Sequence, residues 1–195
     1  VSGVMAQLYQ AYKDLNTGVN PPSALMKCIL LNTADDLGNP GPDFKHGWGV
    51  VNSHRAFQVL ESNSYFNGSV SQNMVNTHAI NIPTGTEQVK VMVYWHDREG
   101  SSSASIALVN NINSKIISPN GNNFFPYVLN STANSSLLNQ DASYGIDNLN
   151  NMEQIVIDNP ISGNYILQID GASIPFGPQE YYVSYEFISD SVKLA

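Results

Sequence analysis

The chain has 195 residues, of which 12% are charged, and its formal net charge is −8 with only eight Lys and Arg residues. This acidic balance argues against nucleic acid and against an anionic membrane surface as partners, and the single cysteine, Cys28, excludes an internal disulfide. A hydrophobic fraction of 42% is enough for one large domain, or for a small domain and part of another.

The first part of the chain is predicted to form three helices. Apolar side chains recur at helical spacing over residues 1–15. A second helix is predicted from Ala24 to about Asn32, because the prolines just before it are tolerated in a first helical turn. Asn52 or Ser53 is suited to cap a third helix.

These predicted helices have no strand of their own to cover. A block of about 60 residues is near the lower limit for independent folding, and its apolar faces need a partner. We therefore expect the backbone amides of residues 1–60 to exchange rapidly in the isolated chain, and those of the later strands to exchange slowly.

The second part of the chain changes character. Residues 63–76 are rich in Ser and Asn and are predicted to be a linker. Beyond it, residues 77–192 contain seven or eight short strands with turn residues between them, which is typical of a β-sandwich. The candidate strands are 80–82, 89–95, 105–109, 115–118, 124–129, 154–157, 165–169 and 181–187.

Two segments resemble one enzyme family. Residues 46–57 read His-Gly-Trp-Gly-Val-Val-Asn-Ser-His-Arg-Ala-Phe, with two glycines that let the backbone turn on both sides of Trp48. This order is similar to the closing segment of a subtilisin-like serine peptidase (subtilase) catalytic domain. Residues 1–6, Val-Ser-Gly-Val-Met-Ala, resemble the end of that family's serine motif. The resemblance implies that residues 1–62 are the C-terminal helices of an α/β subtilisin-like catalytic domain.

The same resemblance places the catalytic groups outside this chain. Counted along the motif, the nucleophilic serine lies about six residues before Val1, and the family's catalytic Asp, His and oxyanion Asn precede that serine. Ser2 falls after the nucleophile position, and no histidine of the chain lies in the family's histidine motif. We therefore assign no catalytic residue.

Three segments of the second part resemble the jelly-roll domain that follows the catalytic domain in some bacterial subtilases, a fold type that kexin-like proteases carry as the P domain. They are residues 91–97, 107–113 and 118–121. The two resemblances together imply the C-terminal portion of a secreted subtilisin-like endopeptidase. The resemblance implies that its partner is the N-terminal part of the protease, and that peptide substrates are cleaved by the parent rather than by this chain.

The family resemblance also raises calcium as a cofactor. Calcium takes six to eight oxygen ligands and owes most of its affinity to carboxylates. The candidates are Asp97, Asn111, Asn113, Asp147 and Glu153. Where related jelly rolls carry Asn-Asp-Leu-Asp, this chain has Asn110-Asn111-Ile112-Asn113, so two carboxylates are replaced by amides. The alternative is that these side chains only satisfy backbone groups in turns.

A second function stays open from the sequence. The sandwich is also compatible with a non-catalytic binding or adhesion module that recognises a protein or a glycan. The alternation of Trp95 and the tyrosines within strands favours core packing over an exposed sugar-binding surface. Residues 193–195, Lys-Leu-Ala, resemble the residues that expression vectors append before a purification tag.

Overall fold

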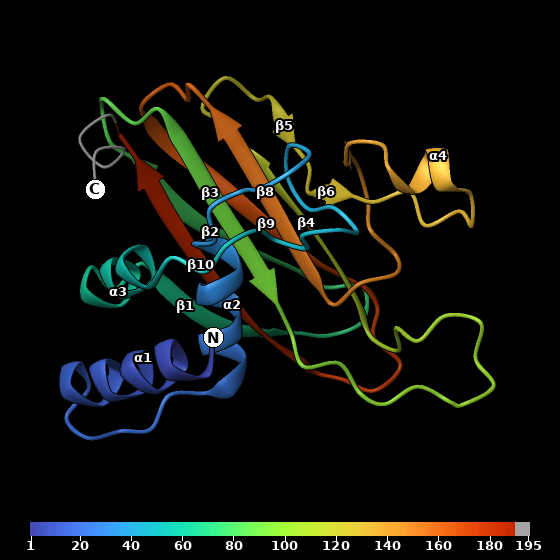
Figure 1. Ribbon diagram of the computed structural model, residues 1–195, viewed down its shortest axis with the longest axis horizontal. Helices are drawn as coiled ribbons and strands as arrows, with labels where there is room; N and C mark the ends of the chain where they lie inside the picture. The colour runs from blue at the N-terminus through green and yellow to red at the C-terminus, as the bar shows by residue number, and fades with distance from the viewer. Residues whose placement is uncertain (190–195) are drawn as a thin grey trace.

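The computed structural model describes residues 1–189 as a β-sandwich with helices on the outer face of one sheet (Figure 1). The predicted fold class, mainly β with helices before the sandwich, is confirmed. One sheet has the order β1 (Tyr65–Val70), β10 (Gln179–Ile188), β3 (Gln88–Tyr94), β8 (Met152–Asp158). The other has the order β2 (Val75–Ile82), β9 (Gly163–Ser173), β4 (Asn111–Ile117), β5 (Asn123–Phe124).

The strand order is that of a jelly roll. β1, β3, β8 and β10 form one sheet while β2, β4, β5 and β9 form the other, so the chain crosses between the sheets after almost every strand. All paired strands are antiparallel. A separate ribbon of β6 (Tyr127–Val128) and β7 (Ser143–Tyr144) follows β5, with the short helix α4 (Ser135–Leu138) between its strands.

The three predicted helices are present. They are α1 (Ser2–Leu15), α2 (Ser23–Asn32) and α3 (Ser53–Glu61). The side chain of Asn52 accepts a hydrogen bond from the Arg55 backbone N–H and so caps α3, as the sequence predicted. Thr17 and Gly18, which follow α1, have positive φ and cannot continue the helix.

The prediction that the helices have no sheet to cover is wrong, because α2 packs on β3 and β10. Strand β3 is apolar on both faces: Val91 and Val93 face the sandwich core, whereas Met92 and Tyr94 belong to the helical cluster. The buried Cys28 Sγ–H donates to the Met92 carbonyl at 3.4 Å. The expectation of rapid exchange over residues 1–60 therefore loses its basis for α2.

Helix α1 lies mainly against α3, and its Tyr12 ring contacts Tyr65 of β1, with centroids 6.1 Å apart. The subtilase resemblance implies that this helix is nearly buried, but Leu8 is its only fully buried side chain. Leu15 is 47% exposed and Tyr9 is 38% exposed. Within this chain, one face of α1 is open to solvent.

The predicted linker at 63–76 contains strand β1 and the first residues of β2. Its Ser and Asn content is misleading because β1 is an edge strand, paired only with β10. Gly68 lies opposite Tyr181, and a Cβ at this position would come within 2.5 Å of the tyrosine hydroxyl. Here glycine marks a close approach within a strand rather than a loop.

Two strand predictions are also wrong. Residues 105–109 form no strand, because the backbone N–H of Val109 is held by the Asp97 carboxylate instead of a neighbouring strand. Residues 124–129 are split between β5 and β6. Pro126 lies at the break and has no N–H to donate to a ladder. The predicted vector-derived residues 193–195 lie outside the described residues.

Gly49, in the loop between α2 and α3, gives a test of a close approach between two backbone segments. Its φ is +100°, and a Cβ would lie 2.0 Å from the Asp35 carbonyl oxygen, which pairs with Val50. We expect Gly49→Ala to lower the free energy of unfolding in urea by about 2–3 kcal/mol. Gly47→Ala is the matched control: its φ is +63° and a Cβ there meets nothing within 4 Å, so it should cost about 1 kcal/mol. Equal costs would contradict the close approach.

Candidate functional site

Three buried oxygen atoms without a hydrogen-bond partner belong to residues at the starts of β4 and β8, which form one corner of the sandwich. They are Asn111 Oδ1, Asn113 Oδ1 and Glu153 Oε1, and over residues 1–189 no other buried side-chain N or O atom lacks a partner. Buried polar atoms are almost always hydrogen-bonded, so each exception needs an explanation. All three residues are among the five that the sequence analysis named as calcium candidates.

Glu153 is the buried acidic group of this corner. It lies near the start of β8, is 1% exposed, and points into the space between the sheets. Its Oε2 accepts from the Ser114 backbone N–H at 2.6 Å and from the Ser114 hydroxyl at 2.5 Å. Burial raises the pKa of this carboxyl to about 8, although both Ser114 hydrogen bonds oppose the shift, and the charge of Asp147 adds to it.

The two asparagines come from β4, on either side of a register shift in its pairing with β9. Asn113 directly precedes Ser114, which holds Glu153. The Asn111 side-chain N–H donates to Asn148 Oδ1 at 2.8 Å, which commits its nitrogen and leaves its oxygen without a donor. Since Asn148 follows Asp147, the first residues of β4 and β8 and the loop before β8 meet at this corner.

The two aspartates are engaged in turns. Asp147 accepts from the backbone N–H groups of Leu149 at 2.8 Å and Asn150 at 3.2 Å. Asp97 accepts from Val109 N at 2.6 Å and Asn110 N at 2.8 Å. Both aspartates therefore satisfy backbone N–H groups in turns, which is the alternative that the sequence analysis left open. Asp147 remains near enough to Glu153 for its charge to act on that carboxyl.

Chemically, the corner offers oxygen atoms only, from one buried carboxylate and two amides, with Asp147 nearby. Oxygen donors without nitrogen or sulfur suit a hard cation such as Ca²⁺. Buried oxygens without partners are atoms that such an ion could satisfy. In the described part of the chain, no three His, Cys, Asp or Glu side chains are grouped closely enough to hold a metal. The low carboxylate count implies weak affinity.

Among the described residues, His78 is the histidine whose side chain makes a hydrogen bond. His78 Nε2 lies 2.8 Å from the Tyr181 hydroxyl, and burial lowers the pKa of His78. Across residues 1–189 no histidine is hydrogen-bonded to a serine side chain.

The sequence analysis did not identify Ser114 and Asn148, which hydrogen-bond to Glu153 and Asn111, or the buried Lys90. Ser114 and Asn148 gave no signal, because a serine in a strand and an asparagine in a loop are ordinary. Lys90 did give one: it is the only charged residue of the apolar run 89–95.

Comparisons with known proteins give weak similarities. No protein-family model matches the chain. A Dictyostelium discoideum protein named "Serine protease/ABC transporter B family protein tagA" is 22% identical over 179 residues, which cover 86% of this chain and 10% of that protein. The chain thus spans about a tenth of that relative's length, and the similarity includes both the helices and the sandwich.

Solved structures resemble the chain only in part. A pre-peptidase C-terminal domain of a Bacillus anthracis collagenase covers 63% of this chain and 87% of its own, with 14% identity and a TM-score of 0.34. PliG of Aeromonas hydrophila, a periplasmic inhibitor of g-type lysozyme, covers 63% of this chain and 84% of its own, with 19% identity and a TM-score of 0.31. TM-scores this low carry no argument about function.

None of the helices described over residues 1–189 has the length and apolar character needed to cross a membrane.

Proposed function

We propose that this chain is the C-terminal part of a secreted subtilisin-like serine endopeptidase, contributing the last helices of the catalytic domain and a jelly-roll domain packed on them. The observation that carries the proposal is the similarity to a protein named as a serine protease, which runs across 86% of the chain and so joins both parts. The subtilase-like motifs at 1–6 and 46–57 and the jelly-roll motifs after residue 90 support it, in the order in which that family has them.

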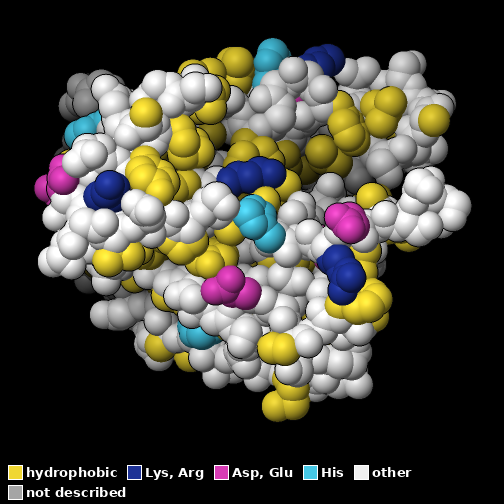
Figure 2. Space-filling view, turned by 90° about the horizontal axis from the view of Figure 1, so that it is seen from below, with side chains coloured by type: hydrophobic (Ala, Val, Ile, Leu, Met, Phe, Trp, Pro, Cys, Tyr) yellow, Lys and Arg dark blue, Asp and Glu magenta, His cyan; other side chains and the backbone are white. Residues whose placement is uncertain are grey.

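Exposed apolar side chains on α1 and α3 favour a partner that covers these helices. Figure 2 shows hydrophobic side chains gathered on the left of the view, where the helices lie. Val1 is 80% exposed and Phe57 is 38% exposed. A groove of about 330 Å³ between α1 and α3 is lined by Val4, Leu8 and Phe57 together with the polar Gln7, Ser53 and His54. Apolar surface of this kind is typical of an interface, and we propose that the upstream part of the protease covers it.

Active-site labelling of the native protein tests this proposal. The protein is recovered from its native source with an antibody against the chain, treated with a serine-directed fluorophosphonate, and mapped by mass spectrometry. We expect a labelled serine about six residues before Val1, in the same or a co-purifying polypeptide. The purified 195-residue chain should not be labelled. A labelled serine within the chain, or native material with no reactive serine, would contradict the proposal.

We further propose that the corner of Asn111, Asn113 and Glu153 binds calcium and stabilises the sandwich. The three unpartnered oxygens of these residues support the proposal. With one buried carboxylate, the expected dissociation constant is roughly 10⁻⁴–10⁻³ M, the range of extracellular calcium modules. Calcium at such concentrations acts on folding by mass action, because the unfolded chain has no assembled site.

A further inference from the structure

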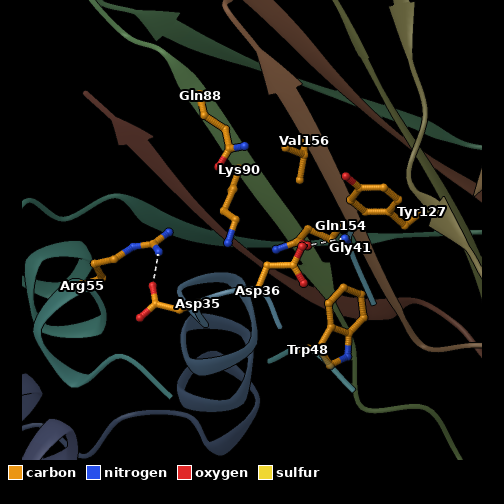
Figure 3. Close-up of a pocket in the computed structure, with 10 residues that line it drawn as sticks. All are labelled: Asp35, Asp36, Gly41, Trp48, Arg55, Gln88, Lys90, Tyr127, Gln154 and Val156. Atoms are coloured by element: carbon orange, nitrogen blue, oxygen red, sulfur yellow. Dashed lines mark hydrogen bonds and ion pairs between the residues drawn. The ribbon is translucent and has the colours of Figure 1, made fainter. Parts of the chain in front are cut away.

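A polar cavity lies outside the calcium corner, on the outer face of the helix-covered sheet. Its volume is about 160 Å³. Five separate segments build it: the loop between α2 and α3, α3 itself, β3, β8 and β6 (Figure 3).

Lys90 supplies hydrogen-bond donors to this cavity. Its side chain stands on the outer face of β3 and only 8% of the residue is exposed. One ammonium N–H donates to the Ala34 carbonyl at 2.9 Å, and its other two N–H groups have no acceptor among the described residues. Burying an ammonium with two of its three donors unmatched is costly. The charges of the nearby acids oppose the effect of burial, which lowers the pKa of Lys90. None of these acids accepts a hydrogen bond from it among the described residues, and Glu186 and Asp35 are bound by Arg55.

Acceptors face the same space. Gln154 commits its side-chain nitrogen to Asn32, at 3.2 Å from Oδ1, and leaves its own Oε1 for the cavity. Asp36 accepts from the Gly41 backbone N–H through Oδ2 at 2.8 Å, and its other oxygen is not engaged by a described residue. In Figure 3, Lys90, Gln154 and Asp36 point toward one another without forming an ion pair.

Two aromatic residues complete the wall. One face of the Tyr127 ring lies against Gly41 and the ring stacks on Tyr144, with centroids 4.9 Å apart. Tyr127 therefore offers its hydroxyl, whose proton is free because Tyr144 donates to its oxygen at 3.3 Å. Trp48 is half-buried and lines this cavity and the neighbouring one, so its indole ring offers an apolar surface beside the polar groups.

Charge and size narrow the class of ligand. Two carboxylates, of Asp35 and Asp36, and two cations, of Arg55 and Lys90, line the cavity, so the formal charges of the lining cancel. An anion would be repelled by the Asp36 carboxylate, and a cation would be repelled by the Lys90 ammonium. A neutral ligand whose groups both donate and accept meets neither penalty. The volume is close to that of a roughly 150 Å³ cavity that accepts a six-membered ring.

We propose that this cavity binds a single pyranose ring of a neutral sugar. The hydroxyls of the ring accept from Lys90 and donate to Asp36 and Gln154, while an apolar ring face packs on Trp48. A few converging polar groups beside an aromatic surface are typical of small-ligand sites. The sugar site is independent of the protease proposal, since it uses no group from outside the chain.

Ligand-observed saturation-transfer NMR on the full 195-residue chain tests the site. The probes are the methyl pyranosides of glucose, galactose, mannose and N-acetylglucosamine, with two smaller ligands, acetate as an anion and glycine as a zwitterion. At least one pyranoside should bind with a dissociation constant on the order of 1 mM, as expected for so small a ligand. In a ¹H–¹⁵N titration, shifts should centre on Gly41, the Trp48 indole N–H and the Gln154 amide.

Asp36→Asn and Lys90→Met should each weaken binding at least fivefold. The first is the milder variant, since the new amide oxygen can still accept from Gly41 and Asp36 is exposed. Asp14→Asn, on the exposed surface of α1, is the matched control and should leave affinity unchanged. Binding of acetate or glycine but no pyranoside would overturn the proposal. So would no pyranoside binding at 20-fold above the expected constant (about 20 mM), or pyranoside binding that Asp36→Asn leaves intact.

Discussion

Replacing Ile29 with alanine should lower the free energy of unfolding by roughly 2–5 kcal/mol, the range measured for large-to-small changes in packed cores. Ile29 lies in the middle of α2 with no exposed surface, in a cluster that joins the helices to Met92, Tyr94 and Tyr182 of the sheet. A cavity at this contact weakens the attachment of α2 to the sandwich as well as the core itself. The measurement is urea unfolding, followed both by far-ultraviolet circular dichroism and by tryptophan fluorescence.

The two probes should report one transition, because α2 and the sandwich share a core and are expected to unfold together. In hydrogen exchange, the amides of α2 should be as protected as those of β3, whereas those of α1 should exchange faster. Leu15→Ala, at the 47% exposed end of α1, is the control and should cost less than about 1 kcal/mol. Separate transitions for helix and strand signals in the unsubstituted protein would show that α2 is not part of the sandwich core.

This contact shows where sequence reasoning reached its limit. Periodicity gave the helices and their bounds because spacing and capping act locally, as at Asn52. The sequence also predicted a strand at 89–95, and its apolar side chains on both faces indicate that both faces of its sheet are covered. What covers the outer face is a long-range pairing, with Cys28 and Met92 separated by 64 positions, and no local pattern encodes it.

For the candidate calcium site, too, the sequence predicted some of the residues and missed others. The resemblance to a family motif pointed to Asn111 and Asn113, and the structure leaves their oxygens buried without partners. It also pointed to Asp97, whose oxygens instead accept backbone hydrogen bonds that tether a loop. A motif does not say whether a carboxylate is free to bind or already engaged. Ser114, which orients Glu153, was not predictable because its role depends on the packing of β4 against β8.

Without calcium, the sandwich should lose stability as the pH rises from about 5 to 8, because of Glu153. The folded-state pKa is raised to about 8 from an ordinary 4.5. In this window the folded protein keeps a proton that the unfolded chain has released, so the unfolded state binds fewer protons and stability falls with rising pH. The loss is on the order of a few kcal/mol, at roughly 1.4 kcal/mol per pH unit of the window. Differential scanning calorimetry in a chelator at pH 5, 6.5 and 8 measures it.

Calcium should reverse this loss, because the cation neutralises the ionised Glu153 carboxylate and satisfies the oxygens of Asn111 and Asn113. At pH 8, calcium at ten times its dissociation constant should add about 1.4 kcal/mol by mass action, which corresponds to roughly 3–6 °C in melting temperature for a chain of this size. Glu153→Gln should remove both the pH-dependent loss and the calcium response, since an amide does not ionise. Glu180→Gln, at an exposed position of β10, is the matched control and should keep both. If Glu153→Gln still responds to calcium, the ion binds elsewhere. If calcium at pH 8 does not change the melting temperature of the unsubstituted protein, this corner does not bind calcium.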